Sequence, residues 1–131
     1  MAWRHLLLDL HGCDRNSLND EKLVRGALKE LSDIMGLHII AGPIIVHYVG
    51  REGSLSGEGL SGFVIVAESH VSIHTDIRTG YASIDVYSCK EFDIDSIEEY
   101  LRREFKPSRI HKKTVLRGPE IEEYAEIQPP K

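Results

Sequence analysis

The residues best suited to chemistry lie at the end of one apolar strand. The run 61–67 is uncharged and rich in valine, and it is followed by Glu68, Ser69 and His70. A serine at a tight turn between two buried strands can attack the peptide bond that precedes it. His74 adds an imidazole with an ordinary pKa of about 6.5, which can accept a proton near neutral pH. The alternative is that these side chains are only hydrogen-bonded turn residues.

A thiol follows on the next predicted strand. Residues 81–89 alternate, which predicts one face toward the core and another that can line a site. Cys89 ends the second set, and a thiol with an ordinary pKa of about 8.5 can donate a proton. The alternative is that Cys89 is a small buried hydrophobic residue. We expect both cysteines to stay reduced, with Cys13 in a structural role.

A zinc site is a further alternative for the same residues. It would use His70, His74 and Cys89 together with a histidine or cysteine near the N-terminus, drawn from His5, His11 and Cys13. Residues i and i+4 of a strand lie about 13 Å apart, so the two histidines are poorly placed to share one ion. We therefore expect no metal.

The remaining patterns predict the elements that hold these residues. Trp3 to Leu10 and residues 38–49 are typical of strands, the latter broken or bent at Gly42-Pro43. Asn19 is expected to cap a helix with an apolar stripe over 23–35 that ends at Gly36. Residues 50–59 read as a glycine-rich loop.

The last third of the chain predicts one more helix and one more strand. Asp95 and Glu98 form a capping-box pattern before a helix that ends at Pro107, and residues 109–117 predict a strand. The acidic tail from Gly118 shows no periodicity. This order predicts a single α+β domain over 1–131, a two-layer sandwich whose largely antiparallel sheet carries both helices on one face.

Composition excludes several classes of function. The net charge is −5 and the basic residues are scattered except over 109–113, so a nucleic-acid partner is not expected. No segment has the length and apolarity of a membrane span or the layout of a signal peptide, so we expect a cytoplasmic protein without a membrane partner.

Three blocks in order resemble the prokaryotic S-adenosylmethionine decarboxylase proenzymes. They are Ser61-Gly62 before a hydrophobic strand, Glu-Ser-His-x-Ser-Ile-His over 68–74, and Asp-Val-Tyr-Ser-Cys over 85–89. Weaker similarity occurs at 8–14 and 115–118, so the resemblance spans most of the chain. It implies a sheet backed by helices and a pyruvoyl-dependent decarboxylase that supplies the aminopropyl donor for spermidine synthesis.

The resemblance implies how such an enzyme matures. Ser69 attacks the carbonyl of Glu68, and the chain is cut autocatalytically into a beta chain, 1–68, and an alpha chain, 69–131. Ser69 then becomes a pyruvoyl group that forms a Schiff base with the substrate amine, so no metal and no pyridoxal phosphate are needed. His74 would be the proton acceptor in processing, assisted by Ser61, and Cys89 the proton donor in decarboxylation. A homodimer of processed pairs is expected.

The chain departs from the family where the substrate binds. Asp76-Ile77-Arg78 stands where relatives carry an aromatic residue, a proline and a glutamate that holds the ribose hydroxyls, and a cation cannot accept a hydrogen bond. Residues 51–60 also lack the aromatic residue that stacks on adenine, for which Tyr48 or Phe63 are the available substitutes.

Two alternatives therefore stay open beside S-adenosylmethionine. One is a pyruvoyl-dependent arginine or ornithine decarboxylase, in which Asp76 or Asp85 pairs with the distal cation of the substrate. The other is a binding or regulatory relative that keeps the fold and is never cut.

Overall fold

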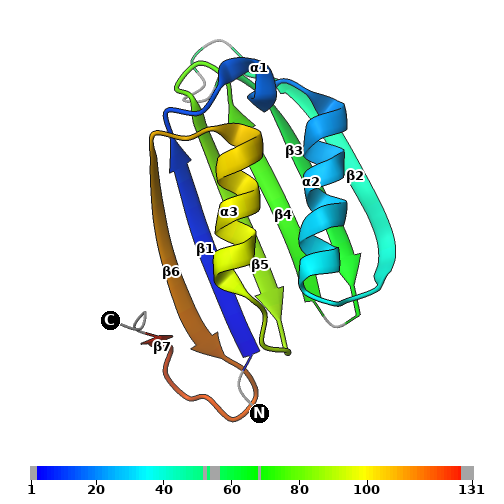
Figure 1. Ribbon diagram of the computed structural model, residues 1–131, viewed down its shortest axis with the longest axis vertical. Coiled ribbons are helices and arrows are strands. Elements are labelled where there is room, and N and C mark those ends of the chain that lie inside the picture. The colour runs from blue at the N-terminus through cyan, green and yellow to red at the C-terminus, as the bar shows by residue number, and fades with distance from the viewer. Residues whose placement is uncertain (1–2, 52, 54–56, 68, 128–131) are drawn as a thin grey trace.

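One antiparallel sheet organises the chain. The computed structural model describes residues 3–51, 53, 57–67 and 69–127. Its strands run in the order β2-β3-β4-β5-β1-β6-β7, and every neighbouring pair is antiparallel (Figure 1). The strands are β1 (Trp3–His11), β2 (Ile39–Val49), β3 (Glu58–Val66), β4 (Ser69–Asp76), β5 (Tyr81–Ser88), β6 (Arg109–Arg117) and β7 (Ala125–Ile127), and the helices are α1 (Arg15–Leu18), α2 (Glu21–Ile34) and α3 (Ile94–Phe105).

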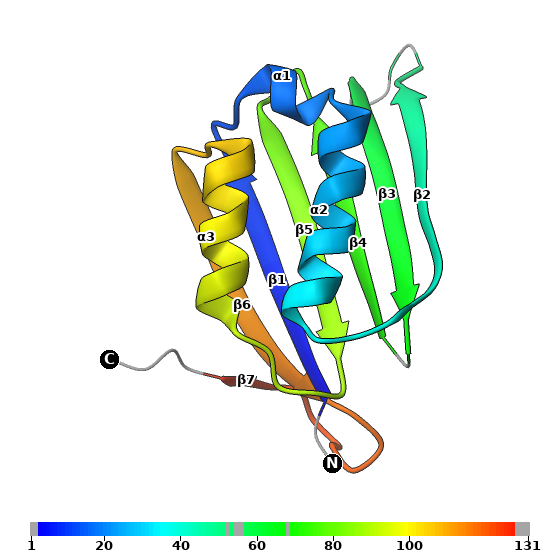
Figure 2. The ribbon, with the colours of Figure 1, turned by 45° about the vertical axis from the view of Figure 1, so that its right-hand side comes forward.

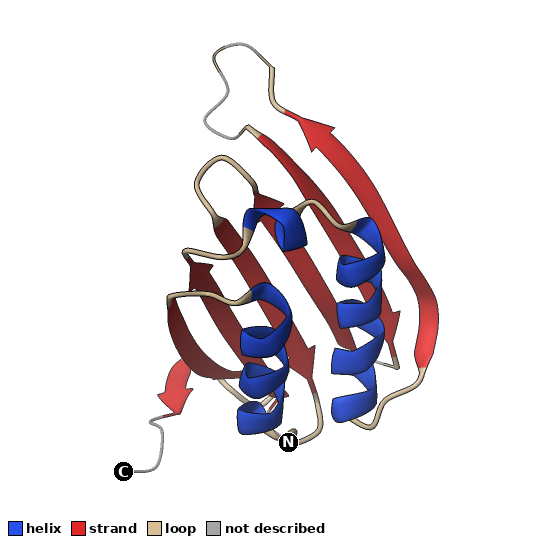
Figure 3. Ribbon diagram, turned by 45° about the horizontal axis from the view of Figure 1, so that its top comes forward, coloured by secondary structure: helices blue, strands red, loops and turns tan. Residues whose placement is uncertain are grey.

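The helices lie on one face of this sheet. Figures 2 and 3 show α2 and α3 side by side across the strands, and no described helix covers the opposite face, which we call the open face. The helices bury Val24, Ala27, Leu28, Leu31, Ile97, Leu101 and Phe105 against the sheet. The α+β two-layer prediction is therefore confirmed. Among the described residues, no helix is both long and apolar enough to cross a membrane.

Both predicted helix caps are wrong by one or two residues. Asn19 ends the short helix α1, and Asp20 caps α2 by accepting a backbone hydrogen bond of 3.1 Å in the first turn. Asp93 caps α3, because its carboxylate accepts both the backbone N–H of Ser96, at 3.3 Å, and its hydroxyl, at 2.7 Å. Asp95 lies in the first turn instead. Asp and Asn are equally good caps, so composition alone does not choose between close neighbours.

Strand boundaries follow the predictions except at three places. β2 is one strand that passes the cis Gly42-Pro43 bond with two shifts of register against β3. β3 begins at Glu58 and so takes in residues that the glycine content assigned to a loop. The tail contributes β7, which pairs with β6 over three residues and is too short to show periodicity. The predicted strand 109–117 is confirmed as β6.

Because α3 packs against the sheet, truncating one of its buried residues should lower the stability of the protein measurably. Leu101 is completely buried. We expect Leu101→Ala to lower the free energy of unfolding by about 2–5 kcal/mol, because the change removes buried methyl groups and leaves a cavity. Urea denaturation followed by circular dichroism measures this. Glu99→Ala on the exposed side of the same helix is the control, with an expected change below about 0.5 kcal/mol. Equal losses in both variants would contradict the assigned packing.

Candidate active site

Alternation along the central strands decides which side chains reach the open face. On β4, Val71 and Ile73 are completely buried toward the helices, and His74 is exposed on the other side. On β5, Ile84 and Val86 are buried in the same way and Tyr87 is only partly buried. The predicted alternation over 81–89 is confirmed.

Ser69 is the first residue of β4 and sits in a sheltered position. It is 7% exposed, and its hydroxyl donates a hydrogen bond of 3.2 Å to the carbonyl oxygen of Ala67. The hydroxyl is therefore turned back along the chain, toward the segment that precedes it. Glu68, the other residue of the predicted cleavage site, lies outside the described residues.

Cys89 lies at the same end of the sheet as Ser69. His70 pairs with Tyr87, and continuing this register places Ser69 opposite Ser88, the last residue of β5. Cys89 follows directly and is half-buried. It lines a hollow of about 510 Å³ together with His38, Ala67, Lys90, Asp33, Gly36 and Leu37. We call the end of the sheet where β4 begins and β5 ends, at the bottom of Figure 1, the Ser69 end.

Ser61 and His74 meet at the opposite end of the same strands. They are register partners on β3 and β4, and the Nδ1 atom of His74 lies 2.9 Å from the hydroxyl oxygen of Ser61. Both line a second hollow of about 290 Å³, whose other lining residues are Tyr48, Gly57, Glu58, Gly59, Thr75, Asp76 and Tyr81. We call this region the His74 end.

The structure does not bring Ser69 and His74 together within one chain. They are the first and sixth residues of β4, and at a rise of about 3.3 Å per residue their Cα atoms are about 17 Å apart. Of the four predicted catalytic residues, Ser61 and His74 are in contact, and Ser69 and Cys89 lie at the opposite end of the same strands. Neither end holds both the predicted nucleophile and the predicted base.

The two predicted substrate-binding aspartates already have partners. The carboxylate of Asp76 accepts hydrogen bonds from the backbone N–H of Arg78, at 3.2 Å, and the hydroxyl of Thr79, at 2.9 Å. Asp85 accepts one from Nε2 of His5 at 2.9 Å, in a pair that is partly buried. Of the aromatic substitutes, Tyr48 lines the hollow at the His74 end, and Phe63 is absent from that lining.

A cluster of rings on the open face was not predicted. Tyr87 is its centre, with ring centroids of Trp3, His5 and His70 at 5.4, 5.8 and 5.5 Å. The guanidinium carbon of Arg117 lies 4.6 Å from the centroid of the same ring. We call these five residues the Tyr87 cluster. Only the alternation on β5 pointed to it, by placing Tyr87 on the side away from the core.

Burial and charge in the Tyr87 cluster shift the pKa of His70, the residue that follows Ser69. Burial, reinforced by the neighbouring imidazole of His5, lowers the pKa of His70 below its usual value. Asp85 opposes this shift and Arg117 adds to it. His70 is therefore a neutral imidazole at neutral pH. Within the described part of the chain, no group of three or more His, Cys, Asp or Glu residues is placed to hold a metal ion.

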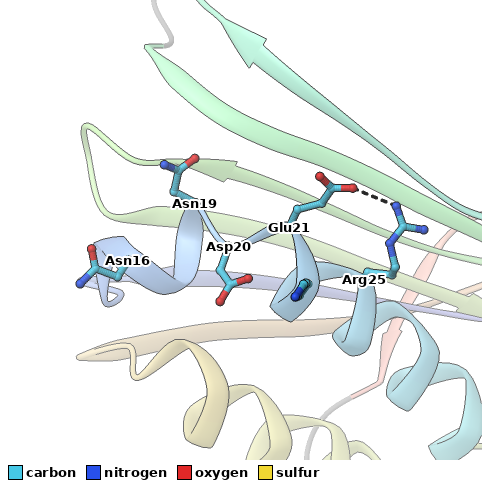
Figure 4. Close-up of a pocket in the computed structure, with 6 residues that line it drawn as sticks. Asn16, Asn19, Asp20, Glu21 and Arg25 are labelled. Atoms are coloured by element: carbon cyan, nitrogen blue, oxygen red, sulfur yellow. Dashed lines mark hydrogen bonds and ion pairs between the residues drawn. The ribbon is translucent and has the colours of Figure 1, made fainter.

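A third hollow lies beside the start of α2 and contains none of the predicted residues. Its volume is about 750 Å³, and Figure 4 shows its polar side chains. Glu21 and Arg25 pair there at 2.9 Å, and Asp20 is engaged as the helix cap. Arg25 also donates to the carbonyl of Pro43 at 3.1 Å. Each charged side chain that lines this hollow, except Lys22, therefore has a partner named here. We assign no chemistry to the hollow.

The two thiols should differ sharply in reactivity. Burial raises the pKa of Cys13 to about 11, so at pH 8 only about one molecule in a thousand carries the reactive thiolate. We expect a disulfide reagent to modify Cys89 rapidly in the native protein and Cys13 only after denaturation. Absorbance of the released thiol counts the modified groups, and Cys89→Ser should abolish the fast phase. Rapid modification of Cys13 in the native protein would contradict its burial.

Comparison with known proteins places this arrangement in a family. The family described as S-adenosylmethionine decarboxylase matches residues 4–118. A proenzyme of that name from Carboxydothermus hydrogenoformans is 34% identical, covering 95% of this chain and 93% of the relative, and one from Methanococcus vannielii is 34% identical, covering 88% of each. The crystal structure of the adenosylmethionine decarboxylase from Aquifex aeolicus superposes with a TM-score of 0.70 at 29% identity, over 93% of this chain and 95% of that one. The chain belongs to the S-adenosylmethionine decarboxylase family.

Proposed function

We propose that this protein is a pyruvoyl-dependent S-adenosylmethionine decarboxylase of the cytosol, made by self-cleavage between Glu68 and Ser69. The processed enzyme consists of chains 1–68 and 69–131. The observation that carries the proposal is the buried Ser69 at the start of β4, hydrogen-bonded to the carbonyl of Ala67 and at the same end of the sheet as Cys89, in a chain of this family.

The surroundings of Ser69 suit a nucleophile that acts on its own chain. At 7% exposure its hydroxyl is shielded from bulk water, which would compete as the attacking group. The hydrogen bond to Ala67 keeps the oxygen near the preceding peptide segment. Once formed, a pyruvoyl group at this position supplies a carbonyl that binds the substrate amine and accepts electrons as carbon dioxide leaves. Cys89 is the nearby proton donor.

The contact between Ser61 and His74 supports a base at the His74 end. In the tautomer that carries its proton on Nδ1, the imidazole donates to the Ser61 hydroxyl and leaves Nε2 able to accept a proton. Ser61 therefore holds the ring in an orientation that suits this role. His74 is exposed, so Nε2 can be reached from outside its own chain.

We infer that a second copy of the chain completes the site. In a two-fold dimer the Ser69 end of one protomer can meet the His74 end of the other, and this happens twice by symmetry. The open face offers an apolar surface for such contact, since Phe63 and Ile65 are 41% and 42% exposed and alternate with buried valines. Ile44 and Val46 on β2 extend this surface beside them. Exposed apolar patches of this kind are typical of protein interfaces.

Tyr48 is the substrate contact that the geometry supports at the His74 end. It shares the hollow with Ser61 and His74, and its ring is 44% exposed. An exposed aromatic face can stack on adenine. The carboxylates of Asp76 and Asp85 are less suited to bind a distal cation, because each already accepts hydrogen bonds within the chain. S-adenosylmethionine is therefore favoured over arginine or ornithine.

Cleavage and turnover test the proposed function together. We expect intact-mass spectrometry of the purified protein to show two chains divided between residues 68 and 69, and Ser69→Ala to give one uncut chain. The cut protein should release labelled carbon dioxide from carboxyl-labelled S-adenosylmethionine, and not from arginine or ornithine. Cys89→Ala should still be cut and should lose turnover, because its thiol acts only after processing.

Three other outcomes would change this proposal. Release from labelled arginine or ornithine would reassign the substrate, and an uncut wild-type chain would favour the non-processing relative. Two fragments from Ser69→Ala would remove Ser69 from its role.

Complementation tests whether His74 acts across the dimer. We expect Ser69→Ala and His74→Ala to be uncut when expressed separately. In mixed dimers the His74→Ala chain keeps its own Ser69 and gains His74 from its partner, so that chain alone should be cut. Different affinity tags on the two chains let a denaturing gel identify the fragments. If neither chain is cut in the mixed sample, His74 acts within its own chain and the shared site is wrong.

A further inference from the structure

Arg117 is an unusual cation because it is held by rings rather than by a carboxylate. Its guanidinium carbon lies 4.6 Å from the ring centroid of Tyr87 and 5.7 Å from that of Tyr124. Its Nη1 group is 3.5 Å from Nδ1 of His5. Among the described residues, no carboxylate lies within ion-pair distance of Arg117, whereas Arg4, one position along β1 from Trp3, is paired with Glu91 at 2.8 Å.

A hydrogen-bonded chain fixes this guanidinium in place. Arginine can only donate, so Nδ1 of His5 accepts and the proton of His5 is on Nε2. That proton is donated to Asp85 at 2.9 Å. Asp85 is therefore engaged by His5, and no carboxylate in the described part of the chain contacts Arg117 directly. A planar donor group with free N–H edges is suited to bind a carboxylate through two oxygens.

The guanidinium of Arg117 lies near the Ser69 end of the sheet. Arg117 is paired with Trp3 on β1, and Arg4 is paired with Ser88, so continuing the register places Trp3 opposite Cys89. The guanidinium reaches across β1 and lies over Tyr87 on β5, two residues before Cys89, which is a rise of about 7 Å. Tyr87 is in turn the register partner of His70, the residue after Ser69.

We propose that Arg117 binds the α-carboxylate of the amino-acid substrate. This role rests on the decarboxylase function proposed above and adds a binding residue to it. S-adenosylmethionine brings one carboxylate into the site, and that carboxylate needs one cation with two donors. The Tyr87 ring and His5 hold the guanidinium in one orientation, so little side-chain freedom is lost on binding.

The chemistry determines which kinetic parameter depends on Arg117. The carboxylate loses its charge as it departs as carbon dioxide, so the interaction is present when substrate binds and fades as the reaction proceeds. Loss of the guanidinium should therefore raise KM without lowering kcat. The decarboxylated product lacks the carboxylate, so its affinity should not depend on Arg117.

The experiment compares Arg117→Met with wild type, using S-adenosylmethionine and its decarboxylated form. The chain has a single tryptophan, Trp3, which contacts Tyr87 in the same cluster, so its fluorescence reports binding directly. We expect KM for S-adenosylmethionine to rise about 10- to 100-fold, the loss typical of one charged hydrogen-bonded contact, with kcat not reduced. The Kd of the decarboxylated compound should change by less than about twofold. Arg102→Met is the matched control, since Arg102 lies on the exposed side of α3 and pairs with Glu98, and its KM should stay at the wild-type value.

Each other outcome has a definite meaning. An unchanged KM in Arg117→Met, or an equal loss of affinity for both compounds, would overturn the proposal. If the methionine variant does not fold, Arg117→Lys keeps the charge without the two-donor edge, and a rise in KM of about three- to tenfold is expected. If wild type proves inactive, the proposed function fails, and fluorescence titration of the same two compounds still tests Arg117. A preference for the carboxylated compound that persists without Arg117 would then reject its role.

Discussion

The length of β4 is the constraint on which the arrangement of the site depends. A strand extends by a fixed rise per residue, so Ser69 at its first position and His74 near its last cannot approach each other in one protomer. The strand is also paired on both sides, with β3 and β5, and cannot bend to shorten that distance. The candidate residues are therefore divided between the two ends of the strand, with Ser69 and Cys89 at one end and the register partners Ser61 and His74 at the other. A chain of this size can hold both halves and still need a second copy to join them.

Much of the fold follows from local patterns that the sequence displays. Alternation on 81–89 correctly divides β5 between core and open face, and the stripe over 23–35 becomes the buried side of α2. The distance between Ser69 and His74 can also be predicted from the sequence. The rise per residue that places His70 and His74 too far apart to share zinc applies equally to Ser69 and His74. The predicted cap of α2 is wrong because Asn19 and Asp20 are adjacent and either side chain can accept the capping hydrogen bond.

The Tyr87 cluster shows what local patterns cannot supply. Its members come from four strands, and residues as distant in sequence as Trp3 and Arg117 become partners only through the order of β6, β1 and β5 in the sheet. Two antiparallel strands can pair in many registers, and a shift of one residue would turn Arg117 to the helix-covered face. The contact between the Arg117 guanidinium and the Tyr87 ring is therefore a property of the assembled sheet.

The two faces of the sheet are stabilised in different ways, and this explains how one small domain can carry a site. The helix-covered face contains the continuous apolar core, from Leu6 on β1 to Val64 on β3, and no buried side-chain nitrogen or oxygen in the described part of the chain lacks a partner. The open face has no such layer above it, so its polar groups satisfy one another, as His5 does with Asp85. Apolar burial on one side stabilises the strands, and their positions then hold charges and rings on the other at fixed spacings. A second protomer on that face would strengthen these polar contacts by excluding water from them.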